Sequence, residues 1–230
     1  MSKRKLVVLT GAGVSAESGI ATFRDSGGLW EGHDVMEVAS PEGWQADPKL
    51  VLDFYNQRRR AAKNSEPNLA HKLLAELEEH FEVIIITQNV DDLHERGGSS
   101  KIIHLHGQLN QSRSTARSSL VYEMDGTELN WGDTCELGSQ LRPNIVWFGE
   151  MVPLLETAAD YARQADIFAV IGTSLVVYPA AGLIHSVPRE SPKYIIDPNM
   201  PTTGNISNLY KIEELATIGT QMLFDILLND

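Results

Sequence analysis

Two histidines, His104 and His106, stand on either side of Leu105 at the end of an apolar run, and Gly107 follows them. Side chains alternate along an extended strand, so both imidazoles face the same side as long as the chain stays extended. Because imidazole titrates near neutral pH, a histidine at a strand end can act as a general base. A histidine that only satisfies local hydrogen bonds is the commoner case for a lone histidine, and the residues alone leave both roles open.

A second polar group, Gln88-Asn89-Val90-Asp91, follows another apolar run. Asn89 and Asp91 share a face if the chain is extended there. An amide and a carboxylate in that arrangement can hold a ribose hydroxyl or a carboxamide. Capping of a loop by these same side chains is the common alternative, and it stays open at this point.

Other catalytic chemistries have little support in the sequence. Metal ligation by His94, His104 and His106 lacks an HExxH or similar spacing, and no G-x-S-x-G segment indicates a serine hydrolase. The single cysteine, Cys135, excludes an intramolecular disulfide and any zinc site built from several cysteines. We therefore predict no metal centre.

A glycine-rich turn, Gly11-Ala12-Gly13-Val14-Ser15-Ala16, comes directly after the apolar residues 6–9 and matches the pattern G-x-G-x-x-G/A. The first glycine permits a tight turn, the second lets the backbone approach a pyrophosphate, and a small third residue lets a helix pack close to the strand. Backbone N–H groups at that helix start would face phosphates. An ordinary strand–helix turn explains the pattern about equally well.

The residues that follow this turn differ from those of a dehydrogenase. The dinucleotide fingerprint expects a second strand that ends in Asp or Glu about 20 residues later. Here residues 22–30 are polar and carry Phe23, Arg24, two glycines and Trp30. We predict a flexible cover over a ligand, with a surface loop tied down by Phe23 and Trp30 as the alternative.

Strand and helix patterns alternate along the chain. Apolar β-branched runs predict strands at 6–9, 81–87, 102–105, 145–148, 167–171 and 194–196. Helical spacing predicts helices within 41–80, with breaks near residues 47–48 and 66–67, and at 158–164, 180–186 and 212–228. This alternation predicts a Rossmann-like α/β fold, a parallel sheet with helices on both faces. Ligands bind such sheets at the carboxyl ends of the strands, where every polar group named here falls.

Composition narrows the class of protein. The chain has 230 residues, a net charge of −12, 42% hydrophobic residues and no apolar run near the roughly 20 residues that cross a bilayer. We expect a cytoplasmic protein with no membrane segment, because the apolar run after the basic residues 3–5 is too short for a signal peptide. The negative charge argues against nucleic-acid binding and suits basic, lysine-bearing partners.

Taken together, several segments resemble the sirtuin family of NAD-dependent protein deacylases. They occur in the family order, cover most of the chain, and are as follows: Gly11-Ala12-Gly13-Val14-Ser15, Ser18-Gly19-Ile20, Phe23-Arg24, Thr87-Gln88-Asn89-Val90-Asp91, Leu93-His94, His104-Leu105-His106-Gly107, Leu141-Arg142-Pro143, Phe148-Gly149-Glu150, Pro153, Gly172-Thr173-Ser174-Leu175, Val177 and Pro179-Ala180. The resemblance implies a large Rossmann-like domain (1–30, 81–107 and 143–230) and a small inserted domain (31–80 and 108–142).

The resemblance also implies that NAD is consumed as a co-substrate, giving nicotinamide and 2′-O-acyl-ADP-ribose. His106 matches the family's general base, and Asn89 and Asp91 match residues that position the nicotinamide ribose and carboxamide. The residues expected to bind the cofactor are Gly11, Ala12, Gly13, Ser15, Phe23, Arg24, Trp30, Gln88, Asn89, Val90, Asp91, Gly172, Thr173, Ser174, Asp197, Asn199 and Ala216.

The expected partners are acylated lysine side chains of proteins. Phe148-Gly149-Glu150, with Val152, matches the strand that pairs with the substrate backbone. Tyr55 and Arg58 lie three residues apart on a predicted helix and resemble the pair in sirtuins that remove malonyl, succinyl or glutaryl groups. Arginine pairs with a terminal carboxylate and tyrosine adds a hydroxyl donor, so we predict a preference for acidic acyl groups. A solvated run of arginines 58–60 beside a core tyrosine is the alternative.

The chain departs from the family pattern in three places. Most sirtuins carry four cysteines on a zinc module, whereas residues 108–142 contain only Cys135, so we expect no zinc. We expect ordinary packing to hold this part, through Leu120, Tyr122, Leu129 and Trp131. The family's usual proline after Ser-Gly-Ile is Ala21 here, which we expect to loosen the loop, and the asparagine at the adenosine ribose corresponds to Asp197 or Asn199.

Three rival functions remain at this point. The same scaffold can serve a plain lysine deacetylase or an ADP-ribosyltransferase. A non-catalytic module that binds NAD or ADP-ribose is a second rival, disfavoured by the intact Asn89, Asp91 and His106. A hydride-transferring dehydrogenase is a third, disfavoured by the missing acidic strand end.

Overall fold

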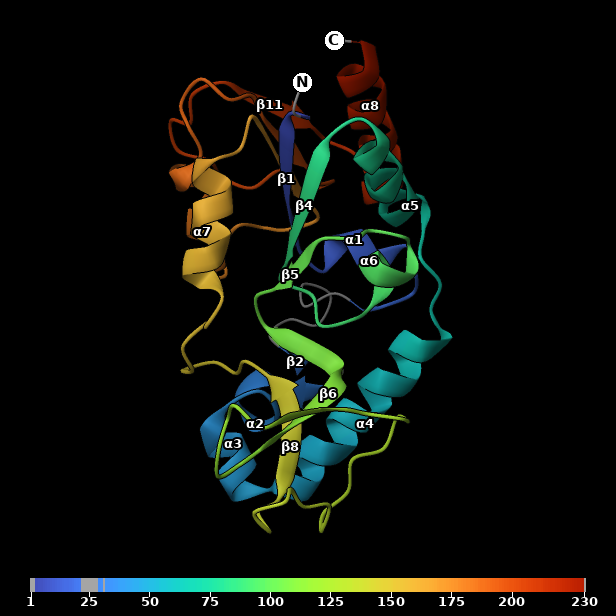
Figure 1. Ribbon diagram of the computed structural model, residues 1–230, viewed down its shortest axis with the longest axis vertical. Coiled ribbons are helices and arrows are strands. Elements are labelled where there is room, and N and C mark those ends of the chain that lie inside the picture. The colour runs from blue at the N-terminus through green and yellow to red at the C-terminus, as the bar shows by residue number, and fades with distance from the viewer. Residues whose placement is uncertain (1–2, 22–28, 31, 230) are drawn as a thin grey trace.

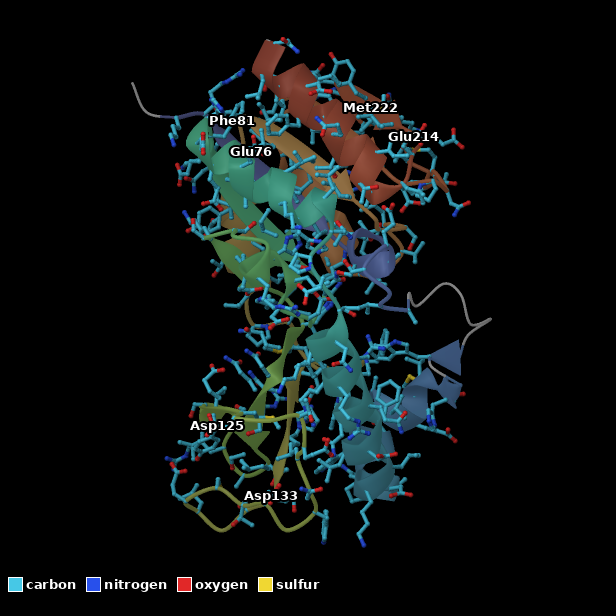
Figure 2. All side chains as sticks on the ribbon, turned by 90° about the vertical axis from the view of Figure 1, so that its right-hand side faces the viewer. Glu76, Phe81, Asp125, Asp133, Glu214 and Met222 are labelled. Atoms are coloured by element: carbon cyan, nitrogen blue, oxygen red, sulfur yellow. The ribbon has the colours of Figure 1, made fainter. Side chains whose placement is uncertain are left out.

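The computed structural model describes residues 3–21, 29–30 and 32–229. It has two lobes, a parallel sheet with its helices at one end and a smaller lobe with an antiparallel sheet at the other (Figure 1). Figure 2 shows the same division from the side, with Phe81 and Met222 in the sheet lobe and Asp125 and Asp133 in the small lobe.

The larger sheet has six strands, all parallel. Across the sheet they are β11 (Leu209–Ile212), β10 (Lys193–Ile196), β9 (Ile167–Ile171), β1 (Lys5–Thr10), β4 (Glu82–Thr87) and β5 (Ile102–His104). Strands β9 and β10 are buried at every residue, as expected for apolar strands covered on both faces. The predicted Rossmann-like α/β fold is confirmed.

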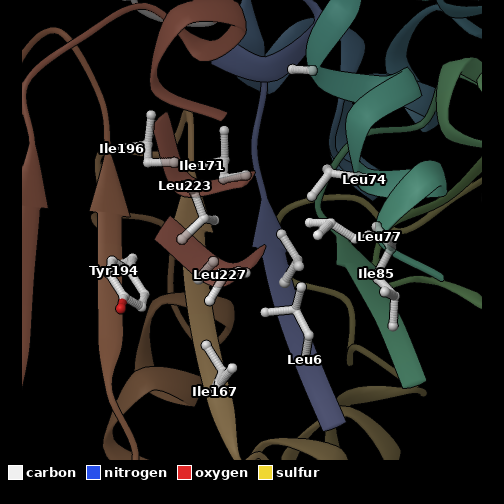
Figure 3. Packing of buried hydrophobic residues seen from close by; sticks show 14 of the residues in the cluster. Leu6, Leu74, Leu77, Ile85, Ile167, Ile171, Tyr194, Ile196, Leu223 and Leu227 are labelled. Carbon is white, nitrogen blue, oxygen red and sulfur yellow. The ribbon is translucent and has the colours of Figure 1, made fainter. Parts of the chain in front are cut away.

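Helices cover both faces of this sheet. On one face α5 (Leu69–Glu76) and α8 (Ala216–Asn229) bury a cluster that includes Leu74 and Leu223, which Figure 3 shows over Leu6 and Ile171. On the other face α7 (Leu155–Arg163) and η2 (Ala180–Ser186), a 3-10 helix, bury a second apolar cluster. Because all six strands are parallel, their carboxyl ends lie along one edge of the sheet.

Side-chain caps explain where two of the helices begin. The breaks predicted near residue 47 and residue 66 are real. Asp47 caps α4 (Pro48–Asn64) by accepting from Leu50 N–H, and Asn68 caps α5 by accepting from Ala70 N–H. The remaining helices are α1 (Gly13–Ala16), α2 (Val35–Val38), α3 (Pro41–Ala46), η1 (Leu77–Glu79) and α6 (Leu93–Arg96).

The small lobe combines α2, α3 and α4 with an antiparallel sheet of strands β6 (Gly107–Ser114), β7 (Val121–Glu123) and β8 (Leu141–Ile145). We call residues 107–145 the three-stranded module. Helix α4 packs on β6 and β8, and Val51, Phe54, Tyr55, Leu109 and Trp147 share one apolar cluster. A short pair, β2 (Leu29–Trp30) and β3 (His33–Asp34), completes the described strands.

Three expectations were wrong, and two strands were missed. Residues 145–148 are not a strand of the parallel sheet: β8 ends at Ile145 and belongs to the module, because it pairs antiparallel with β6. Strands β6 and β11 were not predicted, since their polar residues give no continuous apolar run. Helix α8 begins at Ala216 rather than at residue 212. Trp131 is 56% exposed, so it does not hold the module, whereas Leu129 is buried as expected.

The predicted domain boundaries stay a prediction, and one packing detail bears on them. Helix α5 falls inside the predicted small-domain segment 31–80, yet it packs on α8 and on the parallel sheet. Its contacts favour a boundary between α4 and α5. Among the residues that the structure describes, no helix is long and apolar enough to cross a membrane.

Candidate functional site

The segments that follow β1, β4, β5 and β9 meet at the carboxyl edge of the parallel sheet, between the two lobes (Figure 1). Backbone hydrogen bonds join neighbouring segments there. Gln88 N–H donates to Thr10 O at 2.9 Å, Leu105 N–H to Thr87 O at 2.9 Å, and Gly11 N–H to Ile171 O at 3.1 Å. The predicted polar groups therefore converge on one edge.

The glycine turn is held against the segment after β9. Gly13 N–H donates to Gly172 O at 2.8 Å, and a Cβ on Gly13 would lie 2.6 Å from Gly172 Cα. Gly172 itself has φ +64° and a Cβ there would lie 2.4 Å from Val14 N. The two glycines therefore let these two backbone segments pack directly against each other. This packing brings the start of α1 next to Thr173.

Asn89 and Asp91 meet at Ser15, the one residue of the glycine turn with a polar side chain. Asn89 Nδ2 donates to Ser15 Oγ at 3.1 Å, and Ser15 Oγ donates to Asp91 Oδ2 at 3.2 Å. Asp91 Oδ1 also accepts from Leu93 N–H at 3.2 Å, so the capping alternative holds in addition to the clustering. Burial raises the pKa of Asp91, while the Leu93 and Ser15 hydrogen bonds work in the opposite direction.

Gln88 reaches across to the segment after β9, where its Nε2 donates to Thr173 Oγ1 at 3.2 Å. Behind it, Asn89 N–H donates to Thr87 Oγ1 at 3.0 Å, and Thr10 Oγ1 donates to the same Thr87 hydroxyl at 2.9 Å. Thr10 and Thr87 are cross-strand partners and are fully buried. This pair fixes the start of the Gln88–Asp91 segment, and no pattern in the sequence indicated it.

His106 stands next to these groups. Its Nδ1 lies 2.9 Å from Gln88 O, a carbonyl that can only accept, so Nδ1 carries the proton and Nε2 has a free lone pair in the neutral ring. Burial lowers the pKa of His106, partly offset by the Gln88 hydrogen bond. At pH 7 the ring is therefore neutral and able to accept a proton.

His104 and His94 have other roles. His104 bonds Asn89 O at 3.2 Å through Nδ1 and Glu95 Oε1 at 2.6 Å through Nε2, and His94 Nε2 lies 3.0 Å from Thr10 Oγ1. Strand β5 ends at His104 and residues 105–106 form a turn, so the condition under which the two histidines would share a face, an extended chain, is not met. Across residues 3–21, 29–30 and 32–229, no three His, Cys, Asp or Glu side chains are grouped as metal ligands.

The end of β10 carries the two candidates for the adenosine ribose. Asp197 is buried and accepts from Asn199 N–H at 2.8 Å, whereas the side chain of Asn199 is exposed. Ala216 is buried at the first position of α8, and Ser174 is half-buried beside Thr173. Phe23 and Arg24 lie outside the described residues.

The segment expected to pair with substrate is a turn in this structure. Phe148 N–H donates to Ala39 O at 2.9 Å, and Gly149 has φ +88°. The Glu150 carboxylate accepts from Trp147 N–H at 2.9 Å and from Arg142 Nη1 at 2.8 Å. Arg113 Nη2 adds two more bonds to Glu150, and these contacts lower its pKa against the effect of burial.

Two further observations describe the surroundings of this turn. Val152 packs with the apolar cluster under α7 and η2. Val146 N–H donates to His106 O at 2.9 Å, which brings the turn beside the histidine.

Tyr55 and Arg58 both contact Trp30 from α4. Tyr55 is fully buried, its ring centroid lies 6.5 Å from that of Trp30, and its hydroxyl accepts from Trp147 Nε1 at 3.0 Å. The Arg58 guanidinium lies 4.3 Å from the Trp30 ring centroid. Burial raises the pKa of Tyr55, so the phenol keeps its proton. The alternative of a solvated arginine run beside a core tyrosine is confirmed for Tyr55, which is in the core, and for the exposed Arg60, but not for Arg59, which is 3% exposed.

Trp30 and Trp147 pack around the Tyr55–Arg58 pair. Trp30 contacts this pair and packs on Phe54 at 5.1 Å between ring centroids, and its expected role in binding the cofactor stays a prediction. Trp147 carries the Arg142 guanidinium 3.3 Å from its ring centroid. In the sequence, only its position directly before Phe148 could have indicated that Trp147 lies near the site.

Known proteins resemble this chain over nearly its whole length. The profile of the Sir2 family matches residues 11–179. An NAD-dependent protein deacylase of Helicobacter pylori (strain ATCC 700392 / 26695) is 56% identical over 220 residues, which are 96% of each chain. Another, from Bacteroides thetaiotaomicron, is 52% identical over 230 residues and 98% of each chain. The chain belongs to the Sir2 family.

Solved structures agree with this assignment. A Sir2 homologue in complex with ADP ribose has a TM-score of 0.90 at 40% identity, covering 99% of this chain and 93% of that one. A Sir2 homologue bound to NAD has a TM-score of 0.89, also at 40% identity, covering 99% and 90%. The Sir2 fold therefore accounts for the two lobes and for the edge between them.

Proposed function

We propose that this Sir2-family enzyme removes acyl groups from protein lysines with NAD as co-substrate, and that it prefers acyl groups with a terminal carboxylate. The observation that carries the proposal is the convergence of the glycine turn, the Asn89–Ser15–Asp91 chain and His106 at one sheet edge. Both the deacylase relatives and the NAD-bound homologue support the general activity.

The residues at this edge fit a dinucleotide. The backbone-on-backbone contact of Gly13 with Gly172 leaves no side chain between α1 and the β9 loop, because a Cβ on either glycine would collide with the other segment. We assign phosphate binding to Gly11, Ala12, Gly13 and Ser15, with Gly172, Thr173 and Ser174 beside them. For the adenosine end we assign Asp197, Asn199 and Ala216, and Asn199 has the exposed side chain of that set.

Asn89 and Asp91 are assigned to the nicotinamide ribose and carboxamide, together with Gln88 and Val90. Their positions are fixed before any ligand binds, since Ser15 joins both side chains and Thr87 holds the Asn89 main chain. Such pre-organisation places polar groups without further cost of ordering when the reaction begins. NAD supplies an activated ribose from which nicotinamide can leave.

His106 is assigned as the general base. The Gln88 carbonyl fixes its tautomer, so Nε2 is the nitrogen that takes a proton from a ribose hydroxyl. Because burial lowers its pKa, the ring is unprotonated at pH 7 and ready for that step. The products would be free lysine, nicotinamide and 2′-O-acyl-ADP-ribose.

The peptide would lie along residues 148–152. Phe148 is 41% exposed beside the turn of Gly149, while Glu150 is engaged by two arginines. We therefore assign backbone and apolar contacts to Phe148, Gly149 and Val152, and we assign to Glu150 the task of holding the turn rather than touching the peptide.

The acidic-acyl preference follows from Tyr55 and Arg58. Arg58 is fixed over Trp30, and the Tyr55 oxygen accepts from Trp147, which leaves the phenolic proton to donate. A terminal carboxylate accepts from both an arginine and a hydroxyl donor, whereas a plain acetyl group has no carboxylate to accept these bonds. A site built to make such bonds discriminates strongly against a substrate that cannot make them.

The test compares succinyl-, malonyl- and acetyl-lysine peptides with NAD, for the wild type and for Arg58→Met. We expect desuccinylation to fall at least 100-fold, about 3 kcal/mol, and deacetylation to change far less. Arg60→Met is the matched control, because Arg60 is an exposed neighbour that pairs with Glu128. Equal loss of both activities in Arg58→Met would contradict the acyl preference and favour a plain deacetylase.

A further inference from the structure

We propose that Asn56 and Arg59 are positioning residues that hold the Gln88–Asp91 segment in place through the main chain of Leu109. This inference rests on the proposed function, because it assigns a role in that reaction to side chains outside the site. Both residues belong to α4, in the small lobe, and neither was singled out by its sequence pattern.

Arg59 is a buried cation held by neutral oxygens. Its side chain is 3% exposed, and it donates from Nε to Thr127 O at 2.9 Å, from Nη1 to Leu109 O at 3.3 Å, and from Nη2 to Asn56 Oδ1. Burial lowers the pKa of Arg59 to about 10, so it stays charged at pH 7. A charge buried in this way is costly, and its planar fork fixes the directions of all three acceptors.

Asn56 clamps the loop that follows β7. Its Oδ1 accepts from Leu129 N–H at 2.9 Å and its Nδ2 donates to Leu129 O at 3.2 Å. The same Oδ1 accepts from Arg59, so the two side chains act as one unit on a single face of α4. Together they tie both the loop at 127–129 and strand β6 to the helix.

Leu109 carries the effect to the site. Its carbonyl accepts from Arg59, and its N–H donates to Val90 O at 2.8 Å. Val90 lies between Asn89 and Asp91, so this bond fixes the middle of the segment that holds both. Leu109 is 4% exposed, which keeps water from replacing either bond.

Helix α4 is also fastened at the other end of this segment. Arg96 of α6 donates to Ala62 O at 3.1 Å and to Ser65 O at 2.6 Å, at the carboxyl end of α4. Residues 88–92 thus lie between two attachments to the same helix, one through Leu109 and one through α6. Movement of the segment relative to α4 has to break one of them.

Lysine cannot reproduce this arrangement, since a single ammonium has no fork that reaches three separate oxygens. Arg59→Lys should therefore weaken the hold on the Leu109 and Thr127 carbonyls while keeping the charge, and Asn56 should still hold Leu129. Asn56→Ser is the second, milder variant. Arg60→Lys is the matched control, because Arg60 contacts the same loop from outside through Glu128, with 45% and 48% of the two side chains exposed.

The experiment measures nicotinamide release by the full-length chain with an acyl-lysine peptide and NAD, urea unfolding, and amide hydrogen exchange at Leu109. We expect Arg59→Lys to lower kcat at least tenfold after correction for the folded fraction, with KM for the peptide within twofold. The rate of amide hydrogen exchange at Leu109 should rise in the same variant. Asn56→Ser should move both quantities in the same direction by less, and Arg60→Lys should move neither.

Three results would overturn the proposal. The first is a folded Arg59→Lys chain that loses protection at Leu109 but keeps kcat within twofold of the wild type. The second is a loss of kcat that only follows the unfolded fraction in both variants, or chains of both variants that do not fold. The third is a wild type that releases no nicotinamide. This result refutes the proposed function itself, and it differs from the first two because the wild type fails as well as the variants.

Discussion

At the carboxyl edge of the parallel sheet, turns are held by backbone packed directly on backbone, as at Gly13 and Gly172. In the three-stranded module, turns are held by side chains that reach from α4 to main-chain oxygens, as Arg59 does to Thr127 and Leu109. The first kind of contact requires one residue type and leaves a glycine pattern in the sequence. The second can be built from many side chains and leaves no such pattern.

The largest effect should come from adding a methyl group at the sheet edge. Gly172→Ala places a Cβ 2.4 Å from Val14 N on a residue with φ +64°, so we expect the free energy of unfolding to fall by about 3 kcal/mol or more. Gly126→Ala in the module is the control, because a Cβ there meets nothing within 4 Å. Urea unfolding of both variants measures the difference, and equal small losses would refute the contrast.

Acid should weaken the sheet lobe selectively. Burial lowers the pKa of His71 to about 4 in the folded chain, against 6.5 for an exposed histidine, and lowers the pKa of His94 too. Between pH 6.5 and pH 4, His71 binds a proton in the unfolded state but not in the folded state. Stability from the neutral His71 is therefore present above pH 6.5 and lost as the pH falls toward 4, by on the order of 3 kcal/mol.

Hydrogen exchange at pH 7 and pH 4.5 can locate this loss. The three-stranded module contains no histidine. Amides of α5 and β1 should therefore lose protection before those of β6 and β8, and His71→Gln should flatten the dependence of stability on pH. Loss of protection in the module first would show that the buried histidines are not the acid-sensitive groups.

The dependence of kcat/KM on pH should show a smaller effect than the loss of stability in acid. The general base must be neutral, and burial lowers the pKa of His106. The acidic limb of kcat/KM is therefore expected below the pH of an exposed histidine, with a tenfold fall per pH unit beneath it. An acidic limb above pH 7 would contradict the assignment of His106 as a base of lowered pKa.

The smallest effect is expected at the surface of the module. Trp131 is 56% exposed, so Trp131→Ser should change the free energy of unfolding by no more than about 0.5 kcal/mol. Chemical denaturation of the variant checks this. A loss above about 2 kcal/mol would mean that the indole contributes to the module's core after all.

The contrast between the two regions also explains what the sequence could predict. Buried runs such as Ile167–Ile171 and the glycine turn predicted the sheet, its helices and the edge where Asn89, Asp91 and His106 meet. Apolar runs and glycines can be recognised in a short stretch of sequence. Because parallel strands all end on the same side of the sheet, the residues that follow these runs are brought to one edge. The family resemblance added the roles that the side chains are proposed to have.

Other features depend on contacts that local patterns do not encode. Strand β6 is polar along much of its length, and its pairing with β8 is set by residues about 30 positions away. Arg59 looks the same in the sequence as its exposed neighbour Arg60, and only the return of the chain at 127–129 distinguishes them. Glu150 was expected to touch substrate, and the two arginines that engage it come from β6 and β8.

The most direct test of the account is mass spectrometry of the products formed from a succinyl-lysine peptide and NAD, with the wild type and with His106→Ala. We predict free lysine peptide, nicotinamide and O-succinyl-ADP-ribose in equal amounts from the wild type, and a loss of at least 100-fold in His106→Ala. An untouched peptide, or ADP-ribose attached to the peptide in place of a deacylated lysine, would contradict it.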